Sequence, residues 1–169
     1  IEAFTKGAEE AGNSITTFLL DRMDIHGCKG CWQGGKNPDH PCVQRDDMDK
    51  IYPVYRQADV VVLASPLYYW TLSGQLRTAF DRLFAVAECD PEYRNPQKAG
   101  VLLMAAEGNG FEESVYYYSR LMQHIKWKDL GQILVGGVTQ PGDIQGNEGL
   151  QRAYDLGKSI QYSDETNIH

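Results

Sequence analysis

An unbroken apolar run at residues 60–64 (Val-Val-Val-Leu-Ala) constrains the fold of this chain more than any other stretch. A β-branched run of this kind is typical of a strand buried on both faces, as in a parallel sheet between two layers of helices. Pro66 lacks the backbone N–H that strand pairing uses, so we expect pairing to end at Ser65 and Pro66. Three aromatic residues follow at the carboxyl end of the strand, where open α/β sheets place their ligands. We therefore predict that Ser65 to Trp70 forms a wall of a cofactor site.

Helical and strand patterns alternate along the rest of the chain. We expect helices at residues 1–11, from Asp46 or Asp47 to about 57, from Ser73 to about 84, at 111–125 and at 150–160, and strands at 14–20, 59–64, 99–106 and 132–138. Pro53 should bend or shorten the second of these helices. A long polar loop fills residues 21–45, and residues 161–169 read as a polar tail.

This alternation predicts an α/β fold, a doubly wound parallel sheet with helices on both faces. The leading helix calls for a strand before it, which lies outside this numbering. The expected architecture is therefore a five-stranded sheet of flavodoxin type in one domain spanning residues 1–169. No internal repeat and no linker interrupts the chain.

Charge and composition exclude several classes of function. The formal net charge of −7 argues against non-specific binding to nucleic acid or to an anionic membrane, because both attract basic surfaces. No apolar run approaches the roughly 20 residues that cross a bilayer. Four cysteines in 169 residues do not make a disulfide scaffold, so a reduced, cytoplasmic setting is expected. Walker, nucleophile-triad and Gly-x-Gly-x-x-Gly patterns are absent from the sequence, which leaves hydrolases, NTPases and Rossmann dehydrogenases without support.

A block of spaced motifs resembles the NADPH-dependent FMN reductase family, which consists of flavodoxin-like flavoproteins. The block comprises Ser65-Pro66-Leu67-Tyr68-Tyr69-Trp70, then Gln75-Leu76-Arg77, then Asp81-Arg82. The resemblance extends from the loop at Cys28 to the C-terminal helix. It implies non-covalently bound FMN, NADPH or NADH as reductant, and a flavin that often sits at a dimer interface, in a homodimer or homotetramer.

A flavin ring is flat and mostly apolar, and it needs a few hydrogen-bond donors at its polar edge. The predicted cofactor-binding residues are Ser65, Pro66, Leu67, Tyr68, Tyr69 and Trp70 from the first loop and Ala106, Glu107, Gly108 and Asn109 from the Gly-rich loop after the next strand. The alternative is that the aromatic residues fill a core or an interface. In the family the FMN phosphate binds between the first strand and the first helix, which places its site before Ile1. We expect no catalytic side chain, because the cofactor supplies the chemistry.

The loop from His26 contains Cys28-x-x-Cys31 and, further on, His40 and Cys42. This spacing suits a zinc site, a redox dithiol or free thiols in a loop that covers the flavin site, and the sequence does not decide among them. Related iron–sulfur flavoproteins carry a compact four-cysteine motif here. This loop has no fourth cysteine, so a four-thiolate cluster is not expected and no metal ligand is assigned.

Other charged and thiol side chains have simpler interpretations. We expect Cys89 to be inert and the aspartates at residues 46, 47 and 49 to complement the start of a helix. Asp81 and Arg82 should form an exposed pair or a dimer contact.

The leading hypothesis is an FMN-dependent NAD(P)H oxidoreductase that passes electrons to a small-molecule acceptor, namely a quinone, an azo or nitro compound, or free flavin. The first alternative is a flavodoxin-like electron carrier without small-molecule turnover. The second is a flavodoxin-fold binding protein that has lost its cofactor.

Overall fold

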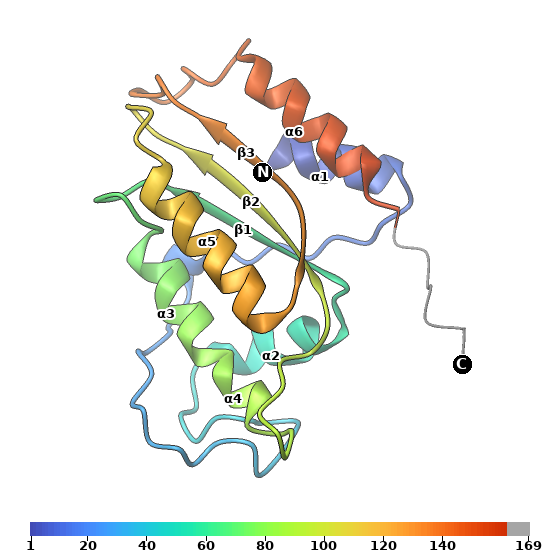
Figure 1. Ribbon diagram of the computed structural model, residues 1–169, viewed down its shortest axis with the longest axis vertical. Coiled ribbons are helices and arrows are strands. Elements are labelled where there is room, and N and C mark those ends of the chain that lie inside the picture. The colour runs from blue at the N-terminus through green and yellow to red at the C-terminus, as the bar shows by residue number, and fades with distance from the viewer. Residues whose placement is uncertain (162–169) are drawn as a thin grey trace.

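Three parallel strands form a sheet in the order β1-β2-β3 (Figure 1). The strands are β1 (Val60–Pro66), β2 (Ala99–Ala105) and β3 (Lys128–Val135), with Leu63 opposite Leu102 and Leu102 opposite Gln132 in the register. The computed structural model describes residues 1–161, so most of the predicted polar tail lies outside the described residues. Because β2 is central, it is buried along nearly its whole length, as its apolar sequence requires.

Helices cover both faces of this sheet, as Figure 1 shows. On one face lie α1 (Glu2–Glu10) and α6 (Glu148–Ser159), and on the other lie α2 (Met48–Gln57), α3 (Gly74–Arg82), α4 (Phe84–Ala87) and α5 (Glu112–Ile125). A 3-10 turn, η1 (Leu20–Arg22), precedes the long loop. The described part of the chain thus has the helix–sheet–helix layers that alternating elements predict.

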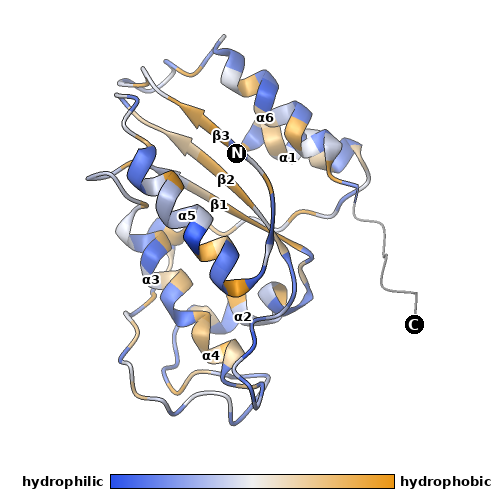
Figure 2. Cartoon of the chain, in the orientation of Figure 1, coloured by the Kyte–Doolittle hydropathy of each residue, from blue (hydrophilic) through white to orange (hydrophobic). Residues whose placement is uncertain are grey.

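The buried apolar residues form two hydrophobic cores, one on each face of the sheet. The larger core joins α2, α3 and α5 to the sheet through residues such as Tyr52, Leu102 and Tyr118, and the smaller joins α1 and α6 through Phe4 and Ala153. In Figure 2 the strands are coloured mostly as apolar, whereas the helices other than α4 carry both polar and apolar residues. The buried residues of the longer helices lie on the sides that face these cores.

Helices α1 and α6 cross so closely that only glycine fits at the points of contact. A Cβ atom on Gly7 would lie 2.1 Å from the carbonyl oxygen of Tyr154, and one on Gly157 would lie 2.2 Å from that of Phe4. Each glycine thus lets the backbone of the other helix approach directly. This contact closes the smaller core.

Most of the predicted elements are present, and two expectations about the strands are wrong. Residues 14–20 form no strand, because no strand among the described residues lies beside them to share hydrogen bonds, although Ile15 and Phe18 still pack against the two cores. The sheet accordingly has three strands within residues 1–161 rather than the four expected there, to which the predicted five-stranded sheet adds one before Ile1. The expected end of the first strand is confirmed, because β1 ends at Pro66, which lies opposite Ala105.

The helix after Ser73 is shorter than the apolar pattern predicts. It divides at Leu83 into α3 and the single turn α4, and Phe84 is 40% exposed rather than part of the buried stripe. Pro53 lies inside α2, yet the helix still reaches Gln57 as expected. The change at Leu83 matters because it turns Phe84 toward the cysteine loop.

Candidate functional site at the carboxyl ends of the strands

Three loops meet where the parallel strands end, because neighbouring parallel strands point the same way. They comprise residues 67–72 after β1, 106–111 after β2 and 136–138 after β3 (Figure 1). Hydrogen bonds continue past the strand ends and tie the loops together, with Leu67 N donating to Ala105 O at 3.1 Å and Gly137 N donating to Glu107 O at 2.9 Å. The structure thus brings together the two loops that the sequence predicted, and it adds a third.

The first loop is a two-residue turn with Tyr69 and Trp70 at its centre. Tyr68 N donates to Thr71 O at 3.0 Å, and Thr71 N donates to Tyr68 O at 3.1 Å. Tyr69 has φ of 47° and Trp70 has φ of 61°, the left-handed values that such turns require and that normally select Asn-Gly. A bulky residue at positive φ is strained, and strain of this kind concentrates at functional sites.

The aromatic rings of this turn project into solvent. Tyr69 is 92% exposed, Trp70 60% and Tyr68 58%. These side chains therefore do not fill the core of this chain, which removes one interpretation of the aromatic run. A large exposed apolar group on a strained backbone contributes little to folding, and this combination is expected where a surface binds a partner or ligand.

Hydrogen bonds of two buried serines hold the turn in place. Ser65 Oγ accepts a hydrogen bond from Ser73 N at 2.8 Å and donates one to Pro66 O at 2.6 Å, while Ser73 Oγ accepts one from Leu76 N and so caps α3. Ser114, on α5, donates to Trp70 O at 2.9 Å. The turn is therefore fixed before any ligand arrives. The Ser65 hydroxyl is used by the chain itself, so Ser65 shapes the loop from within.

The second loop, residues 106–110, is open to solvent at Glu107, Gly108 and Asn109. Within residues 1–161, no acceptor of the chain takes the amide protons of Gly108, Asn109 or Gly110. A Cβ atom on Gly110 would lie 3.6 Å from the ring of Trp70, so the two loops adjoin. The result is a row of backbone donors next to an exposed aromatic surface.

Sequence reasoning missed two residues that shape this edge. A Cβ atom on Gly136 would lie 1.9 Å from Asn109 Oδ1, so only glycine lets the loop after β3 support the loop after β2. A Gly-Gly pair directly after a strand was the available signal. Nothing in the sequence indicated that Ser114 reaches the carbonyl of Trp70.

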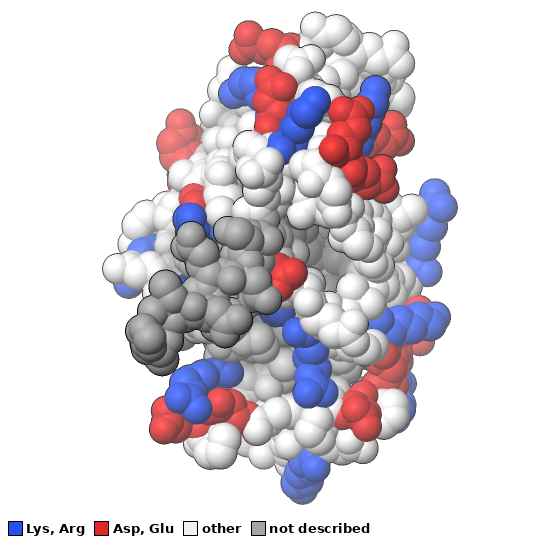
Figure 3. Space-filling model, turned by 90° about the vertical axis from the view of Figure 1, so that its right-hand side faces the viewer, with Lys and Arg blue, Asp and Glu red and all other residues white. Residues whose placement is uncertain are grey.

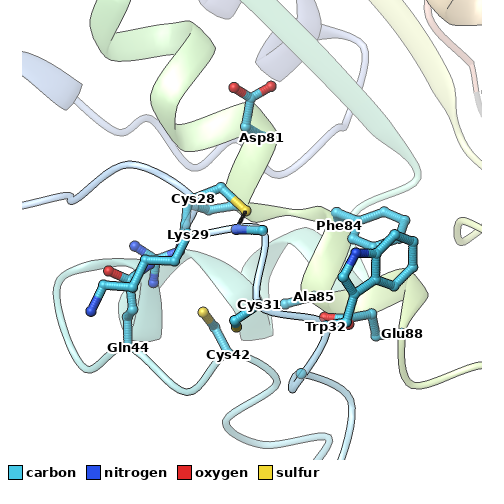
Figure 4. Close-up of a pocket in the computed structure, with 13 residues that line it drawn as sticks. Cys28, Lys29, Cys31, Trp32, Cys42, Gln44, Asp81, Phe84, Ala85 and Glu88 are labelled. Carbon is cyan, nitrogen blue, oxygen red and sulfur yellow. Dashed lines mark hydrogen bonds between the residues drawn. The ribbon is translucent and has the colours of Figure 1, made fainter.

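The cysteine loop lies elsewhere, which corrects the expectation that it covers this edge. Cys28, Cys31 and Cys42 line a cavity of about 150 Å³ that also contacts Asp81, Arg82, Phe84 and Glu88 (Figure 4). These contacts lie at the C-terminal end of α3 and on α4, whereas the aromatic turn precedes the N-terminal end of α3. Nine helical residues separate the two places by roughly 13 Å. All four cysteines of the chain are free thiols here.

Arg82 is buried and pairs with Asp46, so the prediction of an exposed pair or dimer contact for Asp81 and Arg82 is wrong for Arg82. The Arg82 side chain is 0% exposed, and its Nη1 lies 2.6 Å from Asp46 Oδ2 and donates to His26 O at 2.7 Å. Met48 N donates to Asp46 Oδ1, as a helix-start aspartate should allow. The ion pair therefore fixes both ends of the cysteine loop to α3.

Electrostatics reinforce this pair. Burial alone would raise the pKa of Asp46, but the hydrogen bonds from Arg82 and from the His26 and Met48 amides outweigh it and hold the pKa below its usual value. Burial would lower the pKa of Arg82, but the hydrogen bond to Asp46 and the electrostatic attraction of Asp46 outweigh it and raise the pKa instead. Both groups therefore stay charged throughout the physiological range.

Charges elsewhere are mixed. On the face in Figure 3, acidic and basic side chains alternate rather than forming one basic surface. Among the helices of residues 1–161, none is both long enough and apolar enough to span a bilayer.

Comparison with known proteins identifies the family. The family model for NADPH-dependent FMN reductase matches residues 1–139, so the chain belongs to this family. An iron-sulfur flavoprotein from Archaeoglobus fulgidus is 30% identical over 160 residues, covering 95% of this chain and 70% of that protein. An iron-sulfur flavoprotein from Methanosarcina thermophila is 29% identical over 147 residues, covering 87% of this chain and 73% of that protein.

Solved structures agree on the fold. An NAD(P)H:quinone oxidoreductase from Methanothermobacter marburgensis superposes with a TM-score of 0.68 at 21% identity, covering 96% of this chain and 87% of that one. A flavone reductase gives a TM-score of 0.65 at 18% identity and 93% coverage of this chain, which spans 54% of that chain. A flavodoxin from the Archaea gives 0.54 at 14% identity, covering 94% and 83%. The fold is therefore flavodoxin-like.

Proposed function

We propose that the protein binds FMN at the edge formed by the three strand-end loops and passes electrons from NADPH or NADH to a small-molecule acceptor. The observation that carries this proposal is the Tyr69–Trp70 turn, which exposes two aromatic rings on strained backbone beside free amide donors. A flavin ring needs this combination of a flat apolar surface and a few donors at its polar edge. Membership of the FMN reductase family supports the same cofactor.

The residues present fit the ring portion of FMN, and their proposed roles differ. The aromatic side chains of Tyr68, Tyr69 and Trp70 would cover a face of the ring and exclude water from it. The amides of Gly108 and Asn109 would donate to its polar edge. The remaining predicted contacts would line the walls of the site, chiefly through their backbone, and are Pro66, Leu67, Ala106 and Glu107. Ser65 would act indirectly, because its hydrogen bonds hold the first loop in shape.

The chemistry that FMN supplies when bound is electron exchange with a nicotinamide on one side and with an acceptor on the other. The chain's own part is to position and to shield. The serine hydrogen bonds to Trp70 O and Ser73 N keep the turn rigid, which limits the entropy lost on binding. No side chain needs to act as an acid or base at this edge. The proposed acceptors are a quinone, an azo or nitro compound, or free flavin.

The iron–sulfur cluster in the names of the two relatives does not fit the residues of this chain. Among the described residues, no three His, Cys, Asp or Glu side chains gather closely enough to hold a metal ion. Cys28 Sγ accepts a hydrogen bond from Gly30 N instead, and Cys89 Sγ donates to Ala85 O. We therefore assign no step to a cluster.

Steady-state kinetics test the proposed activity. FMN-loaded protein should oxidise NADPH or NADH when a quinone, a nitroarene, an azo dye or free FMN is supplied, and should do so without a partner protein. A slow background rate that none of these acceptors raises would instead support an electron carrier. FMN that fails to bind at all would refute both functions.

A further inference from the structure

We propose that Cys31 and Cys42 are a redox-active thiol pair, which closes reversibly to a disulfide across the cavity beside α4 by exchange with a low-molecular-weight disulfide. The proposal does not depend on the proposed flavin chemistry. It gives a role to the cysteine loop, which the strand-end site does not use.

The arrangement of the thiols selects this pair. Cys31 and Cys42 both line the cavity, and in Figure 4 their side chains lie beside one another, apart from the sulfur of Cys28. Cys28 lines the same cavity, but its sulfur is turned back to its own loop, where it accepts the Gly30 N–H at 3.4 Å. Cys89 does not line the cavity, and its thiol donates to Ala85 O at 3.6 Å. The sequence spacing alone would have favoured Cys28 with Cys31.

A second observation concerns Arg82, a buried charged residue at the same cavity. Arg82 lines it, its side chain is 0% exposed, and its Nε atom has no hydrogen-bond partner among the described residues. Buried polar groups are nearly always satisfied, so an orphaned donor needs an explanation. The Arg82 guanidinium therefore places a buried positive charge with a spare N–H donor at the cavity that Cys42 lines.

The two partners differ in exposure. Cys42 is half-buried and follows Pro41, which is fully buried. Cys31 is exposed, in a segment without helix or strand, and it precedes Trp32, which has φ of 53° and is 72% exposed. A disulfide needs Cβ atoms about 3.8 Å apart. Closure of the disulfide therefore draws the exposed Cys31 toward Cys42 and displaces the neighbouring Trp32, whose ring packs on Phe84 and Tyr93.

The thiol–disulfide exchange needs no oxidant other than the small disulfide itself. The Cys31 thiolate attacks one sulfur of the small disulfide, which releases one thiol and leaves a mixed disulfide on Cys31. The Cys42 thiolate then attacks the Cys31 sulfur and releases the second thiol. Two protein thiols are oxidised, one small disulfide is reduced to two thiols, and the two protons pass to those products. The roughly 13 Å along α3 keeps the strand-end edge out of this reaction.

Tryptic mapping tests the pairing directly, because trypsin places each cysteine in a different peptide. Cleavage after Lys29, Lys36 and Arg45 leaves Cys31 in residues 30–36 and Cys42 in residues 37–45. After equilibration with oxidised and reduced glutathione and alkylation of the remaining thiols, mass spectrometry of the unreduced digest should show these two peptides joined. Two of the four thiols should become unreactive, and dithiothreitol should restore both.

Matched variants complete the test. Cys31→Ser and Cys42→Ser should each abolish the linked peptide, whereas Cys28→Ser and Cys89→Ser should retain it. Disulfide formation should change the fluorescence contributed by Trp32, and Trp32→Phe should lose that change while keeping the linked peptide. A Cys28–Cys31 link, a stable mixed disulfide on Cys31, or four reactive thiols after oxidation would each overturn the proposal. Circular dichroism confirms that each variant is folded.

Discussion

Arg82 at the end of α3 and Asp46 before α2 form an ion pair whose side chains are 0% and 1% exposed. The pair holds the cysteine loop against the helices, since Arg82 also donates to His26 O. Two charges taken out of water are costly, and their attraction repays that cost only with good geometry and additional hydrogen bonds. Here Asp46 receives hydrogen bonds from Arg82, from the His26 amide and from the Met48 amide.

Arg82→Met should therefore lower the free energy of unfolding by about 3–5 kcal/mol, because it leaves the Asp46 charge buried without a partner. The control is Arg45→Met, which breaks the Arg45–Asp49 pair, where the arginine is 55% exposed. That change should cost less than about 1 kcal/mol. Urea unfolding followed by circular dichroism measures both. Equal, small losses would show that the buried pair does not hold the fold together.

Stability should fall in acid partly through Asp46. Because its pKa is lower in the folded protein than in the unfolded chain, its contribution is present above the unfolded value of about 3.9 and is lost as the pH falls through the folded value. Asp46→Asn should thus be less stable at pH 7 and should lose less further stability below about pH 4. Asp21→Asn, at an exposed position, is the control and should follow the parent protein. Parallel acid curves for Asp46→Asn and the parent would contradict this origin.

The Tyr69→Gly variant tests FMN binding separately from folding stability. Glycine adopts positive φ without strain, and a side chain that is 92% exposed packs against little. The free energy of unfolding should stay constant or rise by up to about 1 kcal/mol. FMN should bind about 5-fold or more weakly, because aromatic stacking on a ring contributes roughly 1–3 kcal/mol.

Tyr93→Gly is the matched control for that variant. Tyr93 also has a positive φ of 55° and is 53% exposed, but it follows α4 and packs on Trp32 and Phe84. Its replacement should leave the dissociation constant for FMN unchanged. If both variants weakened FMN binding equally, the aromatic turn would have no special role.

Gly136→Ala tests the support beneath the donor loop. The new Cβ would lie 1.9 Å from Asn109 Oδ1 and 2.7 Å from Gly108 O, so the loop has to move. We expect FMN affinity to drop about tenfold, which corresponds to 1.4 kcal/mol. Gly74→Ala, at the open first position of α3, should instead leave affinity unchanged and stabilise the helix by up to about 1 kcal/mol. An unaltered affinity in Gly136→Ala would remove the loop after β2 from the proposed site.

Local sequence patterns predicted the elements that position the site. The apolar run before Ser65 and the cap at Ser73 are short-range signals, and both appear in the structure as β1 and the start of α3. The turn geometry could not be predicted, because aromatic residues at Tyr69 and Trp70 oppose the local preference for Asn-Gly. Its strain is maintained by contacts from distant residues such as Ser114.

Long-range pairing explains the other failures. Arg82 was predicted to be exposed because its partner, Asp46, lies 36 residues away in the sequence. The cysteine loop was expected at the flavin edge, yet that same ion pair holds it at the opposite end of α3. The strand expected at residues 14–20 depends on a neighbouring strand, and an apolar pattern cannot supply one.

FMN binding by the purified full-length protein tests the central claim most directly. Titration with FMN, followed by the visible spectrum and by aromatic fluorescence, should show saturable binding of one FMN per chain in the parent protein and in Tyr93→Gly. Tyr69→Gly and Gly136→Ala should show weaker binding at unchanged or modestly altered stability. Absence of FMN binding in the folded parent protein, or equal affinity in all four proteins, would contradict the assignment of the flavin to the strand-end loops.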